Sequence, residues 1–251
     1  MLLLRRVNFP QMTRKRVKVT RSKLLLLIVF LFPGAVMAAV KGEVALGVLT
    51  TSGNSETQSV NGKFALDHDA KPWHQHFEAT AINNSDDEGT TAERYAAGYK
   101  VDYDFTTNNY AFFSADYSKD LFGGVREKTT EAVGYGRRIL NNEQHKLDAE
   151  IGAGARQQED QAGVRSNDLI GRFFANYRWQ ITETNKFAQT VKVEGGEDNV
   201  STEAVSELSL SIIGNLFAKI SFTVRNNSEV PAGTERTDTA TAVNLSYTFG
   251  S

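Results

Sequence analysis

Apolar and polar positions alternate with a period of two along most of the chain after residue 39. In the segment 95–105, Tyr, Ala, Val and Phe occupy the odd positions, whereas Ala, Gly, Lys and Asp occupy the even ones. The segments 145–157 and 242–249 follow the same alternation. A strand gathers alternate residues on one face, whereas a helix would scatter them around its surface. The pattern therefore predicts strands and not helices.

Turn signals divide this part of the chain into twelve segments of similar length. The sequence predicts strands near residues 41–51, 57–68, 73–83, 91–105, 109–119, 127–139, 145–157, 166–180, 185–195, 202–213, 216–227 and 236–249. No apolar run in this part of the sequence is long enough for a transmembrane helix. Because the number of strands is even, both ends of the strand region lie on the same side of the sheet.

The connections between these strands differ in length. Short turns are predicted at 69–72, 106–108, 141–144, 182–184 and 214–215. The alternate connections are mostly longer and acidic or rich in Gly, at 84–90, 120–125, 158–164 and 229–235, and the first of them, at 52–56, is of moderate length. Outer-membrane barrels have short periplasmic turns and longer outer loops. The sequence therefore predicts an all-β fold, an antiparallel up-and-down transmembrane β-barrel of about twelve strands.

Aromatic residues favour the same orientation, because many of them lie within a few residues of a short turn or of the C-terminus. They are Trp73, Tyr103, Phe105, Tyr110, Phe112, Trp179, Phe187, Phe217, Tyr247 and Phe249. Indole and phenol rings favour the headgroup layer of a membrane. We interpret this band as a girdle at the periplasmic rim. The alternative is the aromatic core of a soluble β-sandwich, which would spread the rings along the strands.

The first 38 residues differ from the rest of the chain. They contain eight of the 28 basic residues and no acidic ones, which leaves 20 basic against 30 acidic residues and a charge of −10 for the remainder. An apolar run at 24–32 follows the basic region, then a Pro-Gly pair and small residues up to Ala38. These features indicate an export signal at 1–38, followed by a barrel domain at 39–251. An uncleaved membrane anchor is the alternative interpretation, and Met12 is an alternative start.

Composition narrows the functional classes. The acidic charge of the part after residue 38 would repel phosphate, so no nucleic-acid partner is expected. The absence of cysteine excludes a disulfide scaffold and a thiolate metal site. Together with the barrel pattern, the export signal predicts the cell outer membrane of a Gram-negative bacterium as the location.

The alternation also assigns a side to the charged residues of the strands. If Tyr95, Leu147 and Phe173 face lipid, their charged neighbours face the lumen, because Lys or Arg on the lipid face near the membrane centre costs about 2–4 kcal/mol. The candidate lumen-lining residues are Lys63, Glu78, Lys100, Asp102, Lys146, Asp148, Glu150, Arg172, Arg178, Lys192, Glu194 and Lys219. They form either a ladder of ion pairs that fills the interior or a narrow charged pore. Both signs are interspersed, so strong ion selectivity is not predicted.

Three histidines, His68, His74 and His76, lie near one predicted hairpin and are candidate ligands for zinc or copper. A turn separates His68 from the other two and no cysteine assists, so we interpret all three as exposed side chains at the rim. Acidic loop segments at 86–88 and 159–160 lack the oxygen spacing of a calcium or magnesium cage. The sequence therefore predicts neither a metal site nor a cofactor.

Catalysis has little support in the sequence. There is no Gly-x-Ser-x-Gly segment, and His145 lies beside a short turn without a nearby serine. The Gly-x-Gly pairs at 134–136 and 152–154 lie within strands and fit close packing or lumen space, not phosphate binding. We therefore expect a protein without enzymatic activity. A membrane-embedded hydrolase built from distant residues is the alternative.

A turn motif connects the first two predicted strands. It consists of Thr51, Gly53, Asn54 and Thr57. Asn and Gly tolerate the positive φ that a hairpin turn needs, so the motif has a local structural reason. It is moderately specific between two strands and weak elsewhere.

The run 44–57 that contains this motif resembles the opening of a bacterial family of salt-induced outer membrane proteins, a domain of unknown function. Trp73, the Glu-Arg-Tyr segment at 93–95 and the Gly-Tyr-Gly segment at 134–136 are similar to that family as well. The resemblance covers most of 40–249. It implies an outer-membrane β-barrel without known enzymatic activity, and it assigns no catalytic or ligand-binding residue.

The last predicted strand bears on assembly and partners. Its apolar residues end at Phe249, whereas many outer-membrane proteins end on the aromatic residue that the barrel assembly machinery recognises; here Gly250 and Ser251 follow. The expected partners are outer-membrane lipid, lipopolysaccharide and this machinery, with small solutes if the lumen is open.

The expected role is envelope structure or a response to salt and osmotic stress. A small porin-like channel is one alternative, and a soluble periplasmic lipocalin-like barrel, with apolar residues inside, is another.

Overall fold

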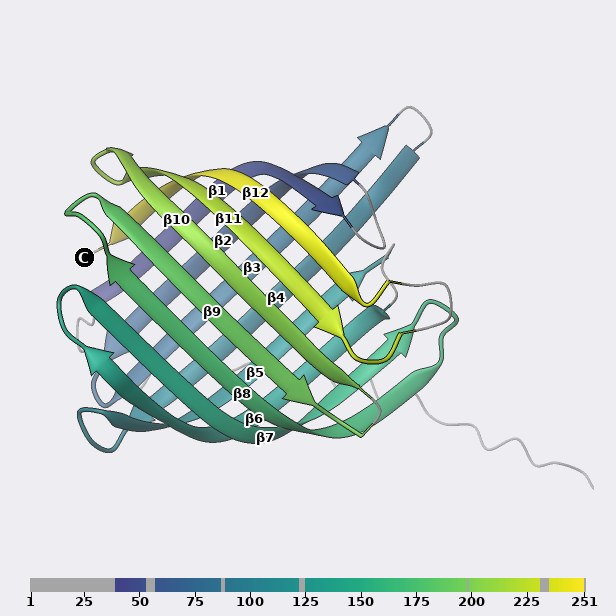
Figure 1. Ribbon diagram of the computed structural model, residues 1–251, viewed down its shortest axis with the longest axis horizontal. Helices are drawn as coiled ribbons and strands as arrows, with labels where there is room; N and C mark the ends of the chain where they lie inside the picture. The colour runs from purple at the N-terminus through teal and green to yellow at the C-terminus, as the bar shows by residue number, and fades with distance from the viewer. Residues whose placement is uncertain are drawn as a thin grey trace, which may run out of the picture. The chain divides into compact units, whose positions relative to one another are not determined.

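The computed structural model describes residues 39–52, 57–86, 89–121, 125–197, 199–230 and 235–250. Within this part of the chain, twelve strands close into an antiparallel barrel, in which sequence neighbours pair and β1 pairs with β12 (Figure 1). The predicted fold class is therefore confirmed. The predicted export signal at 1–38 lies outside the described residues. Among the described residues, no helix is long and apolar enough to span a membrane.

The predicted strand boundaries lie within three residues of the observed ones. The strands are β1 (Ala39–Ser52), β2 (Thr57–Ala70), β3 (Trp73–Asp86), β4 (Gly89–Asp104), β5 (Asn109–Asp120), β6 (Val125–Asn141), β7 (His145–Asp160), β8 (Arg165–Gln180), β9 (Asn185–Gly195), β10 (Val200–Ile213), β11 (Leu216–Asn227) and β12 (Thr237–Gly250). Strand–turn signals therefore locate every element of the barrel.

The β3–β4 hairpin is longer than the sequence indicates, and it projects beyond the neighbouring strands in Figure 1. The prediction of a loop over 84–90 is wrong, because the ladder continues through the pairs Ser85–Thr90 and Asp86–Gly89. The polar side chains of this segment suggest a loop. In a hairpin, however, the backbone N–H and C=O groups pair with one another whatever the side chains are.

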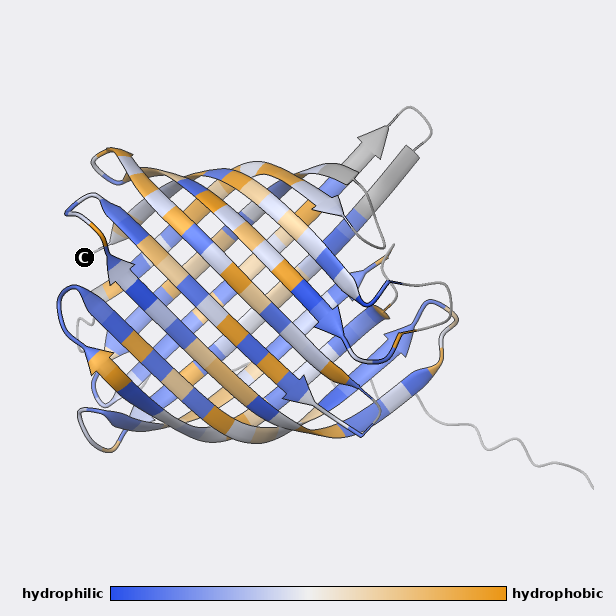
Figure 2. Cartoon of the chain, viewed as in Figure 1, coloured by the Kyte–Doolittle hydropathy of each residue, from blue (hydrophilic) through white to orange (hydrophobic). Residues whose placement is uncertain are grey.

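Alternate residues of each strand lie on opposite sides of the barrel wall. On β1, the side chains of Leu46 and Val48 are 63% and 60% exposed, whereas Ala45 is only 3% exposed. Figure 2 shows the resulting alternation of hydrophobic and hydrophilic positions along the strands. Large apolar side chains thus gather on the outer face, as in outer-membrane barrels. A lipocalin-like barrel would require the reverse arrangement.

One end of the barrel carries all five short turns, and backbone hydrogen bonds tie each turn to a strand beyond its own hairpin. In each case a backbone N–H donates to a turn carbonyl at 2.8–3.2 Å. The donor and acceptor residues are Asp104 and Pro72, Arg138 and Asn108, Gln180 and Gln144, Ser211 and Thr184, and Thr248 and Asn215. We call this the short-turn end and the opposite one the long-loop end. The bonds link the short turns into a continuous rim.

Part of the predicted aromatic girdle lies elsewhere. Trp73 and Tyr103 are exposed, with ring centroids 4.8 Å apart near the short-turn end. The assignment to the girdle is wrong for three rings that face the interior, namely Tyr110, Phe112 and Phe217. On β5, Tyr110 and Phe112 share the inward face, whereas the next residue, Phe113, is exposed on the outside. Distance from a turn does not decide the side of a strand, but parity does.

Candidate functional site in the barrel interior

Ion pairs connect strands that are not neighbours in the sheet, which places these side chains inside the barrel. Strands β4 and β7 are separated by two others, yet Lys100 Nζ lies 2.8 Å from Glu150 Oε1. Further pairs of this kind are Arg138–Asp104 at 2.8 Å, Arg172–Asp116 at 3.3 Å and Lys219–Glu43 at 2.7 Å. The interior is therefore lined by charged groups of both signs.

Side chains from β4 to β8 fill one side of the interior densely. We call this side the filled wall, which comprises Lys100, Tyr110, Phe112, Glu150 and Arg172. Tyr110 and Phe112 are only 2% and 4% exposed, because glycines of β6 and β7 leave room for their rings. A Cβ at Gly136 would overlap the ring of Tyr110, and a Cβ at Gly134 would lie 2.7 Å from Phe112 Cε1. The Gly-x-Gly pairs thus serve close packing.

Cations lie over these rings, and Glu150 contacts one of them, Lys100. Lys100 Nζ is 5.1 Å from the ring centre of Tyr110, and the Tyr110 hydroxyl donates to Glu150 Oε1 at 2.8 Å. The guanidinium of Arg172 lies 5.9 Å from the ring centre of Phe112. Glu150 is buried, so its contacts with an ammonium and a hydroxyl are charge-assisted hydrogen bonds shielded from bulk water.

The opposite side, formed by β1–β3 and β10–β12, carries smaller inward residues. We call it the open wall, and its inward residues include Ala45, Ala65, Ala240, Ala242, Ser246, Lys63 and Glu78. Lys63 Nζ lies 2.8 Å from Glu78 Oε2, and Lys63 also interacts electrostatically with Glu207 on β10, across the interior. Even so, the Lys63 and Glu78 side chains are 31% and 38% exposed. Since both face the inside of a closed barrel, solvent-accessible space exists there.

A further group of charges surrounds Glu203 toward the long-loop end. Arg225 Nε lies 2.6 Å from Glu203 Oε2, and Lys192 Nζ lies 4.0 Å from Glu203 Oε1. Arg94 and Lys128 interact with Glu203 at longer range. We call Arg94, Lys128, Lys192 and Arg225 the basic cluster. Within the described residues, the side chains of Arg94 and Lys128 form no hydrogen bond or ion pair.

At the short-turn end, histidines are held by carboxylates. His74 Nδ1 lies 2.7 Å from Asp69 Oδ1 and His74 Nε2 lies 2.9 Å from Asp104 Oδ2, so this ring is not the freely exposed side chain that we expected. His76 Nδ1 lies 2.7 Å from Asp67 Oδ1. Over the part of the chain that the structure describes, no three His, Asp or Glu side chains are grouped so that they could hold a metal ion.

The predicted lumen-lining residues are distributed among these groups. Their ion pairs are Lys63–Glu78, Lys100–Asp102, Lys100–Glu150, Arg178–Asp148, Arg172–Glu194, Lys192–Glu203 and Lys219–Glu43. Among the described residues, Lys146 forms none. That these residues line a passage stays a prediction.

The turn motif is described only in part. Thr51 lies near the end of β1, and β2 begins at Thr57. Gly53 and Asn54 lie outside the described residues.

Sequence reasoning missed several interior charges, among them Asp116, Glu203 and Arg225. The signal was present, because Asp116 alternates with Ala115 and Tyr117 in the same way as the predicted residues do. What the alternation does not give is the register of distant strands. Without it, the contact between Arg172 on β8 and Asp116 on β5 has no basis in the sequence.

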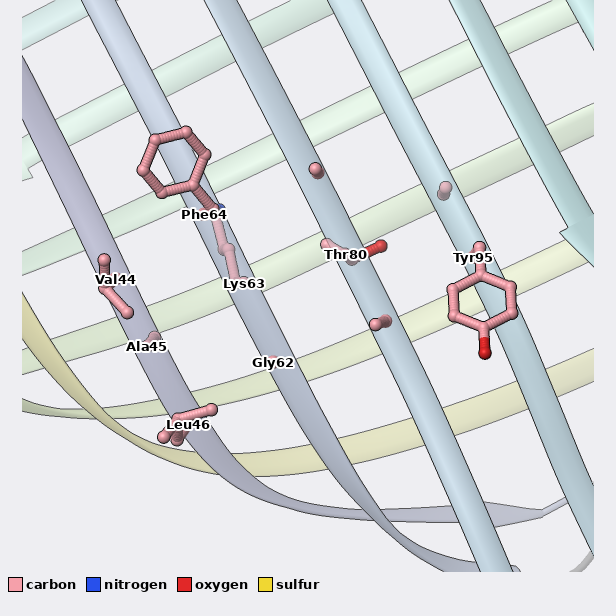
Figure 3. A pocket seen from close by; sticks show the side chains of 11 residues that line it. Val44, Ala45, Leu46, Gly62, Lys63, Phe64, Thr80 and Tyr95 are labelled. Carbon is pink, nitrogen blue, oxygen red and sulfur yellow. The ribbon is translucent and has the colours of Figure 1, made fainter.

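The outer face carries a shallow apolar depression of about 450 Å³ over Gly62. Figure 3 shows Leu46, Phe64 and Tyr95 around it, on β1, β2 and β4. These three side chains are exposed and face away from the interior. The depression thus lies on the outer face, and Lys63 of the open wall is also among the residues that line it.

Comparison with known proteins identifies the family of the chain. Residues 44–249 match the family described as a protein of unknown function, DUF481. The chain belongs to this family. The uncharacterized protein YdiY of Escherichia coli strain K12 is 30% identical over 223 residues, which cover 86% of each chain.

Solved structures show the same fold at low sequence identity. A NanC porin has a TM-score of 0.56 and 11% identity, covering 81% of this chain and 98% of the porin. The COG4313 outer membrane channel from Pseudomonas putida F1 has a TM-score of 0.53 and 10% identity, covering 86% and 97%. The DUF481 barrel thus resembles outer-membrane porins and channels in fold.

Proposed function

We propose that this DUF481 protein is an outer-membrane barrel that lets small hydrophilic solutes pass through a narrow interior. The observation that carries the proposal is the exposure of inward-facing charges on the open wall. Lys63 and Glu78 are about one-third exposed although they lie inside a closed barrel. Charged side chains in contact with solvent can exchange their pairing partners with a passing hydrophilic solute, whereas fully buried pairs cannot.

Several features support the location in an outer membrane. Large apolar side chains face outward, and short turns gather at one end, as in barrels of this kind. Outer-membrane lipid and lipopolysaccharide are the partners proposed for the outer face. For assembly, the proposed partner is the barrel assembly machinery, which would read the last strand up to Phe249.

A structural role in the envelope is the second candidate, and the filled wall favours it. Tyr110, Phe112 and Glu150 occupy space that a wide pore would leave open. Such a barrel would stabilise the envelope, with a role in salt or osmotic stress as the family resemblance implies. Growth of a deletion strain in high salt tests this second role.

Conductance decides between the two candidates. The mature protein is refolded, its folding is checked by heat-modifiable migration on a gel, and single-channel currents are recorded in planar bilayers. Small, uniform steps are expected for a narrow passage. A correctly folded barrel without steps overturns the passage and leaves the structural role. A protein that stays soluble without detergent and does not insert overturns both.

A further inference from the structure

The basic cluster brings four cations together, and two of them form no ion pair among the described residues. Of its four members, Lys192 and Arg225 both lie within 4.0 Å of the same carboxylate, that of Glu203. Arg94 and Lys128 have no carboxylate within that distance among the described residues. Two cations therefore remain for a ligand of opposite charge.

Like charges converge across the interior at this level. Arg94 on β4 lies close enough to Arg225 on β11 for repulsion between them to act, and Lys128 on β6 is repelled in the same way by Lys192 on β9. Asp120, which lies opposite Arg94 in the β4–β5 register, attracts Arg94, as do Glu203 and Asp238. Glu194 and Glu203 attract Lys128, but among the described residues none of these carboxylates forms an ion pair with either cation. An anion placed between such cations relieves the repulsion that they exert on one another.

Solutes can reach the cluster. The Lys192 and Arg225 side chains remain 27% and 36% exposed despite their contacts with Glu203. Both lie inside the closed barrel, because their strands pair them with inward neighbours: Lys192 with Glu203, and Glu203 with Arg225. Any solute that crosses the interior from the long-loop end would meet these groups.

We propose that the basic cluster is a binding site for small anionic solutes, those that carry a carboxylate or phosphate group. Guanidinium and ammonium groups bind both classes of anion through charge-assisted hydrogen bonds. The sequence alone indicates no ion selectivity, because it shows both signs interspersed. In the folded barrel, Lys192 and Arg225 share the carboxylate of Glu203, while Arg94 and Lys128 form no ion pair among the described residues. This inference rests on the proposed passage.

The reversal potential in a KCl gradient tests the inference. The wild-type barrel is expected to favour chloride over potassium, and inorganic phosphate is expected to reduce the current. In the double variant Arg94→Gln/Lys128→Gln, the chloride-to-potassium permeability ratio should fall roughly twofold or more, and block by phosphate should weaken. Glu203→Gln removes the central negative charge, so it should shift the ratio in the opposite direction.

The matched control is Lys119→Gln/Arg137→Gln, which removes the same charge from the outer face. Lys119 pairs with the exposed Tyr95 on β4, and Arg137 shares its side of β6 with the exposed Tyr135. This control should leave the permeability ratio unchanged. Steps without anion preference, or equal effects of the two double variants, overturn the anion site while the passage stands.

A silent barrel overturns the passage but still tests the site. In that case, thermal unfolding of the folded wild type in detergent is compared with and without inorganic phosphate. Phosphate should raise the unfolding temperature of the wild type and of the outer-face control, but not that of Arg94→Gln/Lys128→Gln. Equal shifts in all three proteins would reflect the general effect of phosphate on folding and overturn the anion site.

Discussion

The filled wall and the open wall of the interior are built by the same alternation of side chains, yet the carboxylates Glu150 and Glu78, one on each wall, differ in exposure. Glu150 on the filled wall is 2% exposed and contacts Lys100 and Tyr110. Glu78 on the open wall also has a lysine partner at 2.8 Å, but remains 38% exposed. Parity thus decides that a charge faces inward, while the bulk of the residues around it decides whether water reaches it.

The difference begins with glycine. On β6 and β7, Gly134, Gly136 and Gly152 remove side chains from the inner surface, and the rings of Tyr110 and Phe112 occupy the space. Each ring carries a cation on its face, with Lys100 over Tyr110 and Arg172 over Phe112. The open wall has no such aromatic layer among its described inward residues, apart from Phe217 near the short-turn end. Substitutions on the two walls are therefore expected to have different effects.

Removal of an interior aromatic ring should have the largest effect on the stability of the barrel. Phe112→Ala leaves a cavity between Gly134 and the guanidinium of Arg172, and should lower the free energy of unfolding by about 3–5 kcal/mol. Denaturant unfolding of the barrel in detergent micelles measures this change. Phe113→Ala is the control, because Phe113 is the next residue and faces outward. Equal losses for the two variants would contradict the interior packing of Phe112.

Neutralisation of one carboxylate on each wall compares the walls directly. Glu150→Gln weakens a buried pair with Lys100 and should cost about 3 kcal/mol. Glu78→Gln weakens a solvent-exposed pair and should cost less than about 1 kcal/mol. The same unfolding assay measures both variants. If Glu78→Gln costs as much as Glu150→Gln, the open wall is as tightly packed as the filled wall, and the proposed passage loses its main support.

A methyl group added to β6 beneath the rings of the filled wall should lower the stability of the barrel by an intermediate amount. A Cβ at Gly134 would overlap the Ile151 carbonyl oxygen and lie 2.6 Å from the Gly152 Cα, so Gly134→Ala should destabilise the barrel by about 1–3 kcal/mol. Gly171→Ala is the control, because a Cβ there meets nothing within 4 Å. The measured quantity is the midpoint of denaturant unfolding. A neutral Gly134→Ala would show that the β6–β7 backbone tolerates side chains.

The smallest change is expected in the single-channel current when two charged side chains are removed from the open wall. Lys63→Ala/Glu78→Ala removes two part-exposed side chains from the interior without leaving an unpaired charge, so the single-channel conductance should rise modestly. Phe64→Ala, on the outer face of the same strand, should leave the conductance unchanged. A rise in both proteins, or in neither, would mean that the open wall does not border the passage.

Much of the fold follows from local rules. All twelve strands, the five short turns and the inward side of charges such as Lys100 and Glu150 can be predicted from period-two alternation and turn residues, because each depends on a few consecutive positions. The loop predicted at 84–90 is the exception. Polar composition there does not reveal that the backbone continues to pair.

The sequence by itself determined that this is a closed, apolar-outside barrel with charges inside. Only the tertiary structure decided which charges meet, since Lys100 and Glu150 lie on strands separated by two others, and Arg94 faces Arg225 from the far side of the interior. It also decided that Tyr110 and Phe112 fill one wall and not the membrane rim. The physical reason is that alternation fixes the face of a residue, whereas contacts across a barrel depend on the register and curvature of all the strands between them.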